Sequence, residues 1–139
     1  MADPLRWEES LATGFGALDE QHRALLECSN RLLACAASGP PWVDLERAFL
    51  ELEVSFRAHA AEEEWMMRWL DYPRGDEHAG QHRSFLDQLD QLRASLDRDA
   101  STETIFLARC ASLSAALLEH VAQEDRDLGA HAFGHALSG

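Results

Sequence analysis

Apolar residues recur every three or four positions along four stretches of the chain, which is the spacing of one face of an α-helix. The pattern predicts helices over residues 18–38, 42–70, 75–97 and 102–128. Residues 38–41, 71–75 and 97–101 separate them and are rich in Gly, Pro, Asp and Ser, which end helices. Short connections favour antiparallel neighbours. The prediction is an all-α, up-down-up-down antiparallel four-helix bundle, with an N-terminal arm carrying Trp7 and Phe15.

The length and composition are those of a single globular domain, residues 1–139. Hydrophobic residues make up 46% of the chain, but no apolar run is long enough to span a membrane. The first residues are charged and lack the apolar core of a secretion signal, so we expect a soluble, cytoplasmic protein without membrane insertion. A formal net charge of −13 disfavours nucleic acid as a partner.

The three cysteines, Cys28, Cys35 and Cys110, lack the spacing of a metal site and occupy apolar helix positions. They are interpreted as reduced core residues.

Seven polar residues occupy inward positions of the predicted helices, where a bundle of this size normally has Leu or Val. In an up-down bundle all seven fall at the same end, because a helix rises about 1.5 Å per residue and alternate helices run in opposite directions. A buried polar layer is unfavourable unless it is paired, and metal ions would pair with it. The seven are His22, His59, Glu63, His78, His82, His120 and Asp125.

The spacing within the layer favours a centre with two metal ions. His59 and Glu63, like His78 and His82, are four residues apart and share one helix face, about 6 Å apart. Five imidazoles and two carboxylates suit iron and, less selectively, zinc, copper or manganese. Seven donors exceed what one ion takes, whereas two ions bridged by carboxylates use all of them.

The last ligand position is ambiguous from spacing alone. Asp125 follows His120 by five residues, which places it about 140° around an ideal helix, whereas Glu124 would share the face of His120. Either Glu124 is the ligand, or a local widening of the helix, as in a π-bulge, turns Asp125 inward.

Five separated motifs resemble the bacterial hemerythrin family in order and spacing, from Trp7 to about Leu128, and this resemblance favours Asp125. They are Leu18-Asp19-Glu20-Gln21-His22, His59-x3-Glu63-x2-Met66, Tyr72-Pro73, His78-x3-His82-x2-Phe85 and His120-x4-Asp125.

The resemblance implies two iron ions with an oxo or hydroxo bridge. It assigns one iron to His78, His82 and His120, the other to His22 and His59, and makes Glu63 and Asp125 the bridging carboxylates. Dioxygen would bind at the open position of the iron held by two histidines.

Helical offsets predict the walls of a ligand pocket, and the chain departs from the family pattern there. Ala60 stands where a Phe commonly follows the second-helix histidine, and Ala116 where a Trp commonly lies four before the last histidine. Either Trp65, Trp69 or Phe49 refills the space, or the pocket is roomier than usual. The predicted pocket residues are Leu25, Phe56, Met66, Leu113, Ala116, Leu117 and Val121.

His131 and His135 continue a spacing of four from Asp127, which admits a small second metal site. Gly129 and Gly134 interrupt that helix, so a frayed, exposed tail is the favoured interpretation.

Reversible dioxygen binding, for storage, delivery or buffering, is the leading functional hypothesis. The alternatives are a sensor of oxygen, redox state or nitric oxide and an enzyme that reduces peroxide or nitric oxide. The chain ends soon after the fourth helix, which favours a free-standing carrier over a sensor, and we expect a binding protein rather than an enzyme. The sequence does not indicate a protein partner.

Overall fold

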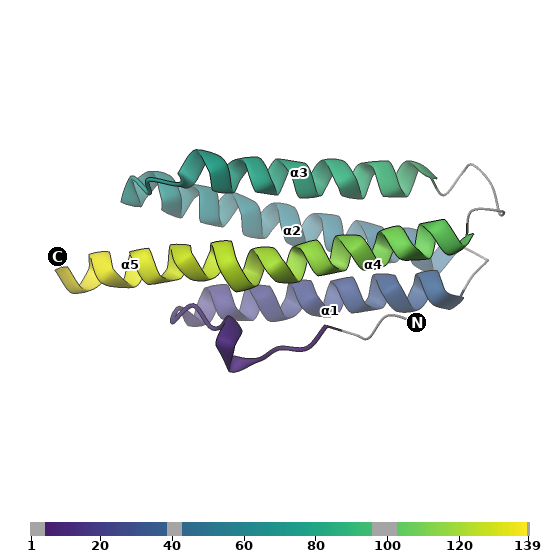
Figure 1. The fold of residues 1–139 in the computed structure, drawn as a ribbon, viewed down its shortest axis with the longest axis horizontal. Coiled ribbons are helices and arrows are strands. Elements are labelled where there is room, and N and C mark those ends of the chain that lie inside the picture. Colours follow the sequence, from purple (N-terminus) through teal and green to yellow (C-terminus); the bar gives the residue numbers. More distant parts are fainter. Residues whose placement is uncertain (1–4, 39–42, 96–102, 139) are drawn as a thin grey trace.

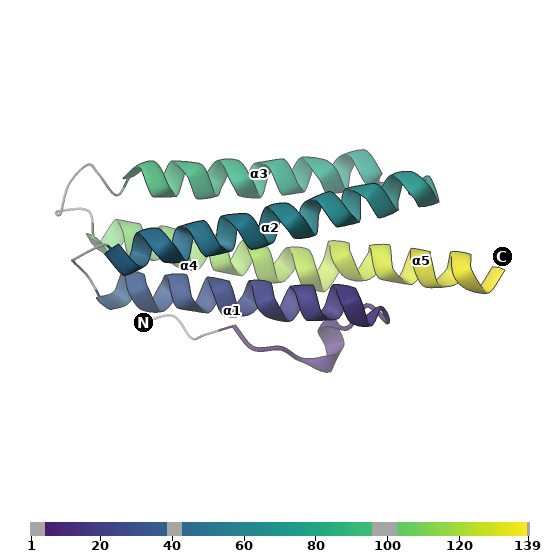
Figure 2. The ribbon, with the colours of Figure 1, turned by 180° about the vertical axis from the view of Figure 1, so that it is seen from behind.

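The structure consists of four helical segments that lie side by side and antiparallel. The computed structural model describes residues 5–38, 43–95 and 103–138. α1 and α3 each pack against both α2 and α4 (Figure 1 and Figure 2). The predicted all-α four-helix bundle is thereby confirmed. Its elements are η1 (Glu9–Leu11, a 3-10 turn), α1 (Gly16–Ser38), α2 (Val43–Leu70), α3 (Gly75–Ala94), α4 (Glu103–His120), η4 (Val121–Asp125, a π-helical turn) and α5 (Arg126–Ser138).

The helix bounds differ from the expected ones mainly at the C-terminal end. α1 begins at Gly16 rather than at residue 18, and α3 is described as helix to Ala94. Expected boundaries at residues 42, 97 and 102, and the connections over 39–41 and 97–101, lie outside the described residues.

The fourth helical segment does not end at residue 128 but continues to Ser138 as α5. Gly129 does not interrupt the helix. It lies where the N-terminal arm passes close to α5. A Cβ built on it would lie 2.6 Å from the Cβ of Thr13, so only a glycine lets the N-terminal arm pass here. Leu128 and Ala132 pack on Met67 and thereby hold this part of the segment against the bundle.

The N-terminal arm is attached to α1 by polar contacts. The backbone N–H and the hydroxyl of Thr13 both donate to Asp19 Oδ1, each at 2.9 Å. Farther along, the backbone of Leu5 exchanges two hydrogen bonds with the side-chain amide of Asn30. The arm therefore covers one side of α1 (Figure 1).

Two apolar regions lie on either side of the polar layer. The main core fills the bundle between the layer and the C-terminal end of α1, and it includes Leu32, Phe49, Leu89 and Cys110. The smaller cluster lies beyond the layer and includes Met67, Leu70 and Leu128. The layer is therefore enclosed by apolar side chains at both ends.

All three cysteines are free, with Cys28 and Cys110 buried and Cys35 half-buried. Over the described ranges, the helices are too short or too polar for any to be a candidate membrane span.

Candidate metal centre

All seven side chains predicted from the sequence converge in one layer near the end of the bundle where α2 and α3 meet. Six of the residues are at most 1% exposed, and the side chain of His120 is 10% exposed. α1 supplies His22, α2 supplies His59 and Glu63, α3 supplies His78 and His82, α4 supplies His120, and the π-helical turn supplies Asp125.

The carboxylate of Glu63 lies among three imidazoles. Its Oε1 is 3.0 Å from Nε2 of His59, 3.1 Å from Nε2 of His78 and 3.0 Å from Nε2 of His82. The ring nitrogens that face the carboxylate come from two different helices. Glu63 therefore links α2 to α3 at the centre of the layer.

The carboxylate of Asp125 has the complementary position. Its Oδ2 is 2.9 Å from Nε2 of His22 and 3.3 Å from Nε2 of His59. Its Oδ1 is 3.0 Å from Nε2 of His78 and 2.9 Å from Nε2 of His120. The two oxygens of Asp125 thus face different pairs of histidines, as a bridging carboxylate requires.

The ligand atoms divide into two overlapping groups, each with its atoms within 4.8 Å of one another. Both groups contain the carboxylates of Glu63 and Asp125. One adds His78, His82 and His120, and the other adds His22 and His59. This division coincides with the one that the family resemblance implied. Among the described residues, no donor group includes His131. The half-buried ring of His131 packs against Tyr72, with the two ring centroids 5.0 Å apart. The His135 side chain lies outside the described residues.

The π-helical turn determines which of the neighbours Glu124 and Asp125 enters the polar layer. Asp125 is fully buried in the layer, whereas the neighbouring Glu124 lies near the surface with its Oε2 3.1 Å from Nη2 of Arg74. The turn Val121–Asp125 contains an extra residue relative to an α-helical turn, and this brings a residue five after His120 onto the same inward face.

Three histidines have a second polar partner on their outer side. Nδ1 of His59 donates to Gln21 Oε1 at 2.8 Å, and Nδ1 of His120 donates to Gln81 Oε1 at 2.8 Å. Nδ1 of His82 lies 3.1 Å from a Glu64 carboxylate oxygen. An acceptor at Nδ1 keeps a proton there and directs the Nε2 lone pair of a neutral imidazole toward a metal.

The role of the two glutamines was not predicted from the sequence. Gln21 precedes His22 and Gln81 precedes His82, yet each contacts a histidine of the next helix. The amide of Gln21 is oriented by a hydrogen bond from its Nε2 to Glu62, so its oxygen faces His59. The repeated dipeptide Gln-His was the available signal.

Several buried atoms of the layer are left without a well-oriented hydrogen bond among the described residues. An unsatisfied buried polar atom costs about 1–3 kcal/mol. Four of these atoms face the carboxylates and imidazoles inside the layer: Nε2 of His22, Nε2 of His120, Oε2 of Glu63 and Oδ1 of Asp125. Coordination of metal ions would use their lone pairs, so the residues present fit a metal centre better than a closed hydrogen-bond network. The other two are Nδ1 of His22 and Nδ1 of His78.

In the metal-free layer the carboxylates and imidazoles stabilise each other's charged forms. Burial lowers the pKa of His59, but hydrogen bonds with Asp125 and Glu63 outweigh burial and raise it to about 10. The same balance raises the pKa of His78 to about 9. Burial and the charge of Asp125 raise the pKa of Glu63, yet hydrogen bonds from three imidazoles lower it to about 2. Metal ions would therefore replace protons in this layer.

The residues predicted to line a ligand pocket are distributed over several regions. Leu25, Phe56, Leu113 and Leu117 are buried in the main core on one side of the layer. Met66 lies on the other side, with the smaller cluster, because it follows Glu63 toward the end of α2.

Val121 packs with Leu11 and Leu26 beneath the N-terminal arm. Ala116 is exposed.

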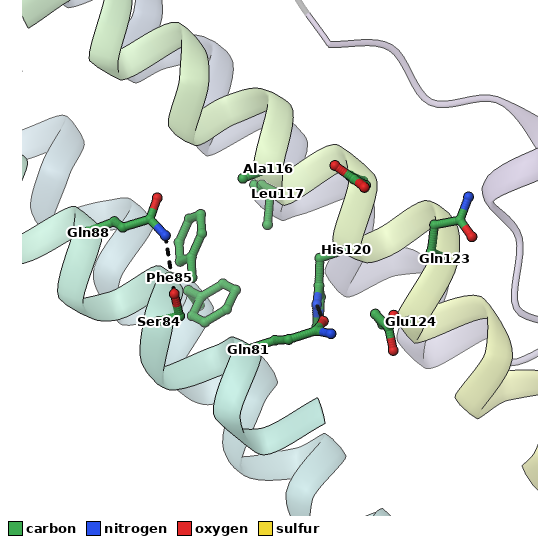
Figure 3. Close-up of a pocket in the computed structure, with 11 residues that line it drawn as sticks. Gln81, Ser84, Phe85, Gln88, Ala116, Leu117, His120, Gln123 and Glu124 are labelled. Atoms are coloured by element: carbon green, nitrogen blue, oxygen red, sulfur yellow. Dashed lines mark hydrogen bonds between the residues drawn. The ribbon is translucent and has the colours of Figure 1, made fainter. Parts of the chain in front are cut away.

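The absence of an aromatic side chain at Ala116 leaves a surface cleft that reaches His120. The cleft has a volume of about 380 Å³. Trp65 and Trp69 do not refill it, because they are 60% and 68% exposed on the outer side of α2. Figure 3 shows the cleft between α3 and α4, and its lining includes Gln81, Ser84, Phe85, Gln88, Ala116, Leu117, His120, Gln123 and Glu124.

An aromatic pair forms part of the wall of the cleft. Phe56 stacks on Phe85 with ring centroids 4.2 Å apart, and its edge contacts His82. Ala60, one turn after Phe56 on α2, is 5% exposed and belongs to the main core. Phe49 is also buried and packs edge-on against Phe106, farther from the layer.

Comparison with known proteins agrees with this arrangement. Residues 13–132 match the family model of the hemerythrin HHE cation-binding domain, a range that contains the whole polar layer. The chain is also 28% identical to a myohemerythrin of Riftia pachyptila over 94 residues, which cover 68% of this chain and 72% of that protein. The resemblance found in the sequence motifs is confirmed, and the chain belongs to the hemerythrin HHE cation-binding domain family.

Proposed function

We propose that this protein binds two iron ions in the polar layer and uses them to bind dioxygen reversibly. His78, His82 and His120 would hold one ion, and His22 and His59 the other. Glu63 and Asp125 would be shared between them. The observation that carries the proposal is the pair of overlapping donor groups with both carboxylates in common.

The donor set of imidazoles and carboxylates is compatible with iron. Among the described residues, no cysteine belongs to either donor group, which argues against a thiolate-held zinc or copper(I) site. Two iron ions supply the two electrons that reversible dioxygen binding requires. Membership of the hemerythrin family supports the same assignment.

The unequal division of the histidines suggests where an external ligand binds. The group with His22 and His59 contains four donors, and the group with His78, His82 and His120 contains five. An ion held by fewer protein donors has more room for an external ligand. We therefore assign dioxygen to the side of His22 and His59.

Apolar residues next to these histidines would keep water away from the bound gas. Leu25 follows His22 by about one helical turn, and Phe56 precedes His59 by about one turn. Leu25 is fully buried and Phe56 is 1% exposed. A dry, apolar wall limits protonation of reduced oxygen and so favours release of dioxygen over its reduction.

Metal analysis and optical spectroscopy test the proposal. The protein is produced with excess iron, reduced without air and then exposed to dioxygen. We expect about two iron ions per chain and an absorption band that appears with dioxygen and disappears on its removal. His131→Gln, a change outside the layer, should behave like the unaltered protein. Fewer than two iron ions per chain, or a band that cannot be reversed, would contradict the proposal.

The cleft beside His120 favours a second candidate, reduction of peroxide by the same centre. Gln81, which bonds His120, lines this cleft, so a small polar molecule could approach the ligand shell from the surface. Sustained turnover of added hydrogen peroxide with an external reductant would support this enzyme function. Stoichiometric oxidation without turnover would support dioxygen binding instead.

A further inference from the structure

The histidines of the polar layer differ in the charge of the group behind each ring. The outer nitrogens, Nδ1, of His59 and His120 each contact the neutral amide oxygen of a glutamine at 2.8 Å. Nδ1 of His82 instead lies 3.1 Å from Oε2 of Glu64, which is a carboxylate. Among the described residues, His82 is thus the one histidine of the layer whose outer nitrogen contacts a negatively charged group.

The negative charge of Glu64 is not neutralised by a cation. Among the described residues, no guanidinium nitrogen lies within 4.0 Å of this carboxylate, and its only ion pair is the one with His82. The side chain of Glu64 is 31% exposed, whereas that of His82 is 1% exposed. Water can therefore solvate the outer side of the carboxylate, while the side that contacts His82 is shielded, so the charge acts on the layer with little screening.

The donor group with two histidines has no equivalent contact. Nδ1 of His22 has no hydrogen-bond partner among the described residues. Behind His59, a carboxylate is reached only through the amide of Gln21, which bonds Glu62. Glu62 is exposed, so water screens its charge. The charge of Glu64 therefore distinguishes the group with three histidines from the group with two.

A carboxylate behind a metal-bound imidazole makes the ring a stronger donor. With Nε2 of His82 turned into the layer, the proton of the neutral ring is on Nδ1 and is donated to Glu64. The carboxylate attracts this proton and thereby raises the electron density at Nε2. A stronger donor stabilises a trivalent ion more than a divalent ion, because the attraction grows with the charge of the ion.

We propose that Glu64 is a positioning residue that acts through His82 and lowers the reduction potential of the metal ion held by three histidines. The inference rests on the proposed function, because it takes this ion to be iron. It gives the two ions unequal potentials, and the ion of His78, His82 and His120 is the first to be oxidised. Glu64 thereby makes the ion farther from the proposed ligand position the readier electron donor.

Removal of the charge without loss of the hydrogen-bond acceptor tests the proposal. Glu64→Gln leaves an amide oxygen that can accept from Nδ1 of His82, as the glutamines do behind His59 and His120. The iron content of the unaltered protein and of the variant is measured first. Stepwise addition of dithionite, which is oxidised, then delivers one electron to each ferric ion. We expect one of the two potentials to rise by about 59 mV or more in Glu64→Gln, which corresponds to a tenfold change in the ratio of ferric to ferrous affinity.

The reverse exchange at Gln81 tests the direction of the effect. Gln81→Glu places a carboxylate behind His120, a ligand of the same ion, and should lower the same potential by about 59 mV or more. Glu64→Gln combined with Gln81→Glu should return the potential toward its unaltered value. The control Glu51→Gln removes the same charge from an exposed position of α2 and should leave both potentials unchanged. A purely structural role of Glu64 would not produce shifts of opposite sign.

Binding of cobalt(II) tests the role of Glu64 independently of iron. Competition with a chelator should show that Glu64→Gln weakens the binding of one of two cobalt ions by about tenfold or more and leaves the other unchanged. Uptake of no iron by the unaltered protein would contradict the proposed function, and the cobalt affinities would still decide the role of Glu64. Equal cobalt affinities in the two proteins would count against that role.

Two results of the titration would overturn the proposal. The first is a pair of potentials that Glu64→Gln leaves unchanged, and the second is a shift in Glu51→Gln as large as the one in Glu64→Gln. Should Glu64→Gln hold fewer than two iron ions, Gln81→Glu decides the question, and a potential that does not fall in this variant overturns the proposal as well.

Discussion

Glu124 and Asp125 are adjacent in the chain, yet the carboxylate of Asp125 points into the bundle and that of Glu124 points to the surface. Asp125 Oδ1 is 2.9 Å from Nε2 of His120 in the buried layer, while Glu124 Oε2 is 3.1 Å from the guanidinium of Arg74 at the surface. The π-helical turn Val121–Asp125 produces this arrangement, because it changes the angular position of every residue after His120.

The two neighbours offer a matched test of the proposed ligand set. Asp125→Asn removes the charge that faces four histidines, so iron content is expected to fall to about one ion or fewer per chain. Glu124→Gln changes only a surface ion pair and should leave about two. Metal analysis after identical iron loading checks both. Equal iron content in the two variants would show that Asp125 is not a ligand.

Two glycines of α5 are expected to respond in opposite ways to alanine. A Cβ on Gly129 would lie 2.6 Å from the Thr13 Cβ and 2.9 Å from the Thr13 carbonyl oxygen. Gly129→Ala should therefore lower the free energy of unfolding by about 1–3 kcal/mol. A Cβ on Gly134 would meet no described atom within 4 Å outside its own helix turn, so Gly134→Ala should raise the free energy of unfolding by up to about 1 kcal/mol. Denaturant unfolding measures both, and a stabilising Gly129→Ala would refute the close approach.

The cleft at Ala116 predicts easy access for small exogenous ligands. Ala116→Trp would fill much of the cleft beside His120 and is expected to slow the binding of azide to the oxidised, iron-loaded protein by about tenfold or more. It should slow autoxidation in the same direction. Stopped-flow absorption measures the azide rate. Ala115→Trp, at an exposed neighbouring position outside the cleft, is the control, and equal rates in the two variants would exclude entry by this route.

The hydrogen bond between Gln81 and His120 predicts an indirect effect on metal affinity. Gln81→Ala removes the acceptor that holds the proton at Nδ1 of His120, and loss of such a partner typically lowers metal affinity by about 10–100-fold. Gln88→Ala removes an exposed amide that bonds only Ser84 among the described residues, so affinity should not change. Competition with a chelator measures the affinities. An unchanged affinity in Gln81→Ala would refute this role.

The shifted pKa values predict how the stability of the metal-free protein depends on pH. The pKa of His59 rises from 6.5 to about 10, so its contribution is complete below about pH 6.5 and is lost as pH rises through about 10. The pKa of Glu63 falls from 4.5 to about 2, so its contribution is complete above about pH 4.5 and is lost as pH falls through about 2. Together they stabilise the fold most between about pH 4.5 and 6.5.

Thermal unfolding of the chelator-treated protein across this range checks the prediction. His59→Gln should flatten the loss of stability on the alkaline side. Unfolding temperatures that keep rising from pH 6.5 to pH 10 would contradict the expected sign.

Much of the site could be predicted because its residues violate the apolar pattern that otherwise specifies the helices. Histidines and carboxylates at inward positions can be recognised in the sequence because their neighbours on the same face are Leu and Phe, and helix direction places them at one end. Gln21 and Gln81 could not be recognised in this way, because polar residues are common at half-buried helix positions. Their partners are on other helices, so the contacts depend on how neighbouring helices are oriented about their axes.

The C-terminal segment shows a second limit. Gly129 lowers helix propensity, and this local property predicted a frayed end after residue 128. The helix persists because Leu128 and Ala132 bury apolar surface against Met67 and Leu70, and because the missing side chain admits Thr13. Burial against distant residues outweighed the local preference.

The sequence by itself determined the helices, the antiparallel order and six of the seven polar residues in the layer, since periodicity and helix rise are local properties. Spacing left the seventh open, and the tertiary structure decided that Asp125 rather than Glu124 enters the layer, that Ala116 opens a cleft, and that Trp65 and Trp69 stay exposed. Each of these depends on the rotation and packing of whole helices, which arise from contacts between residues far apart in the chain.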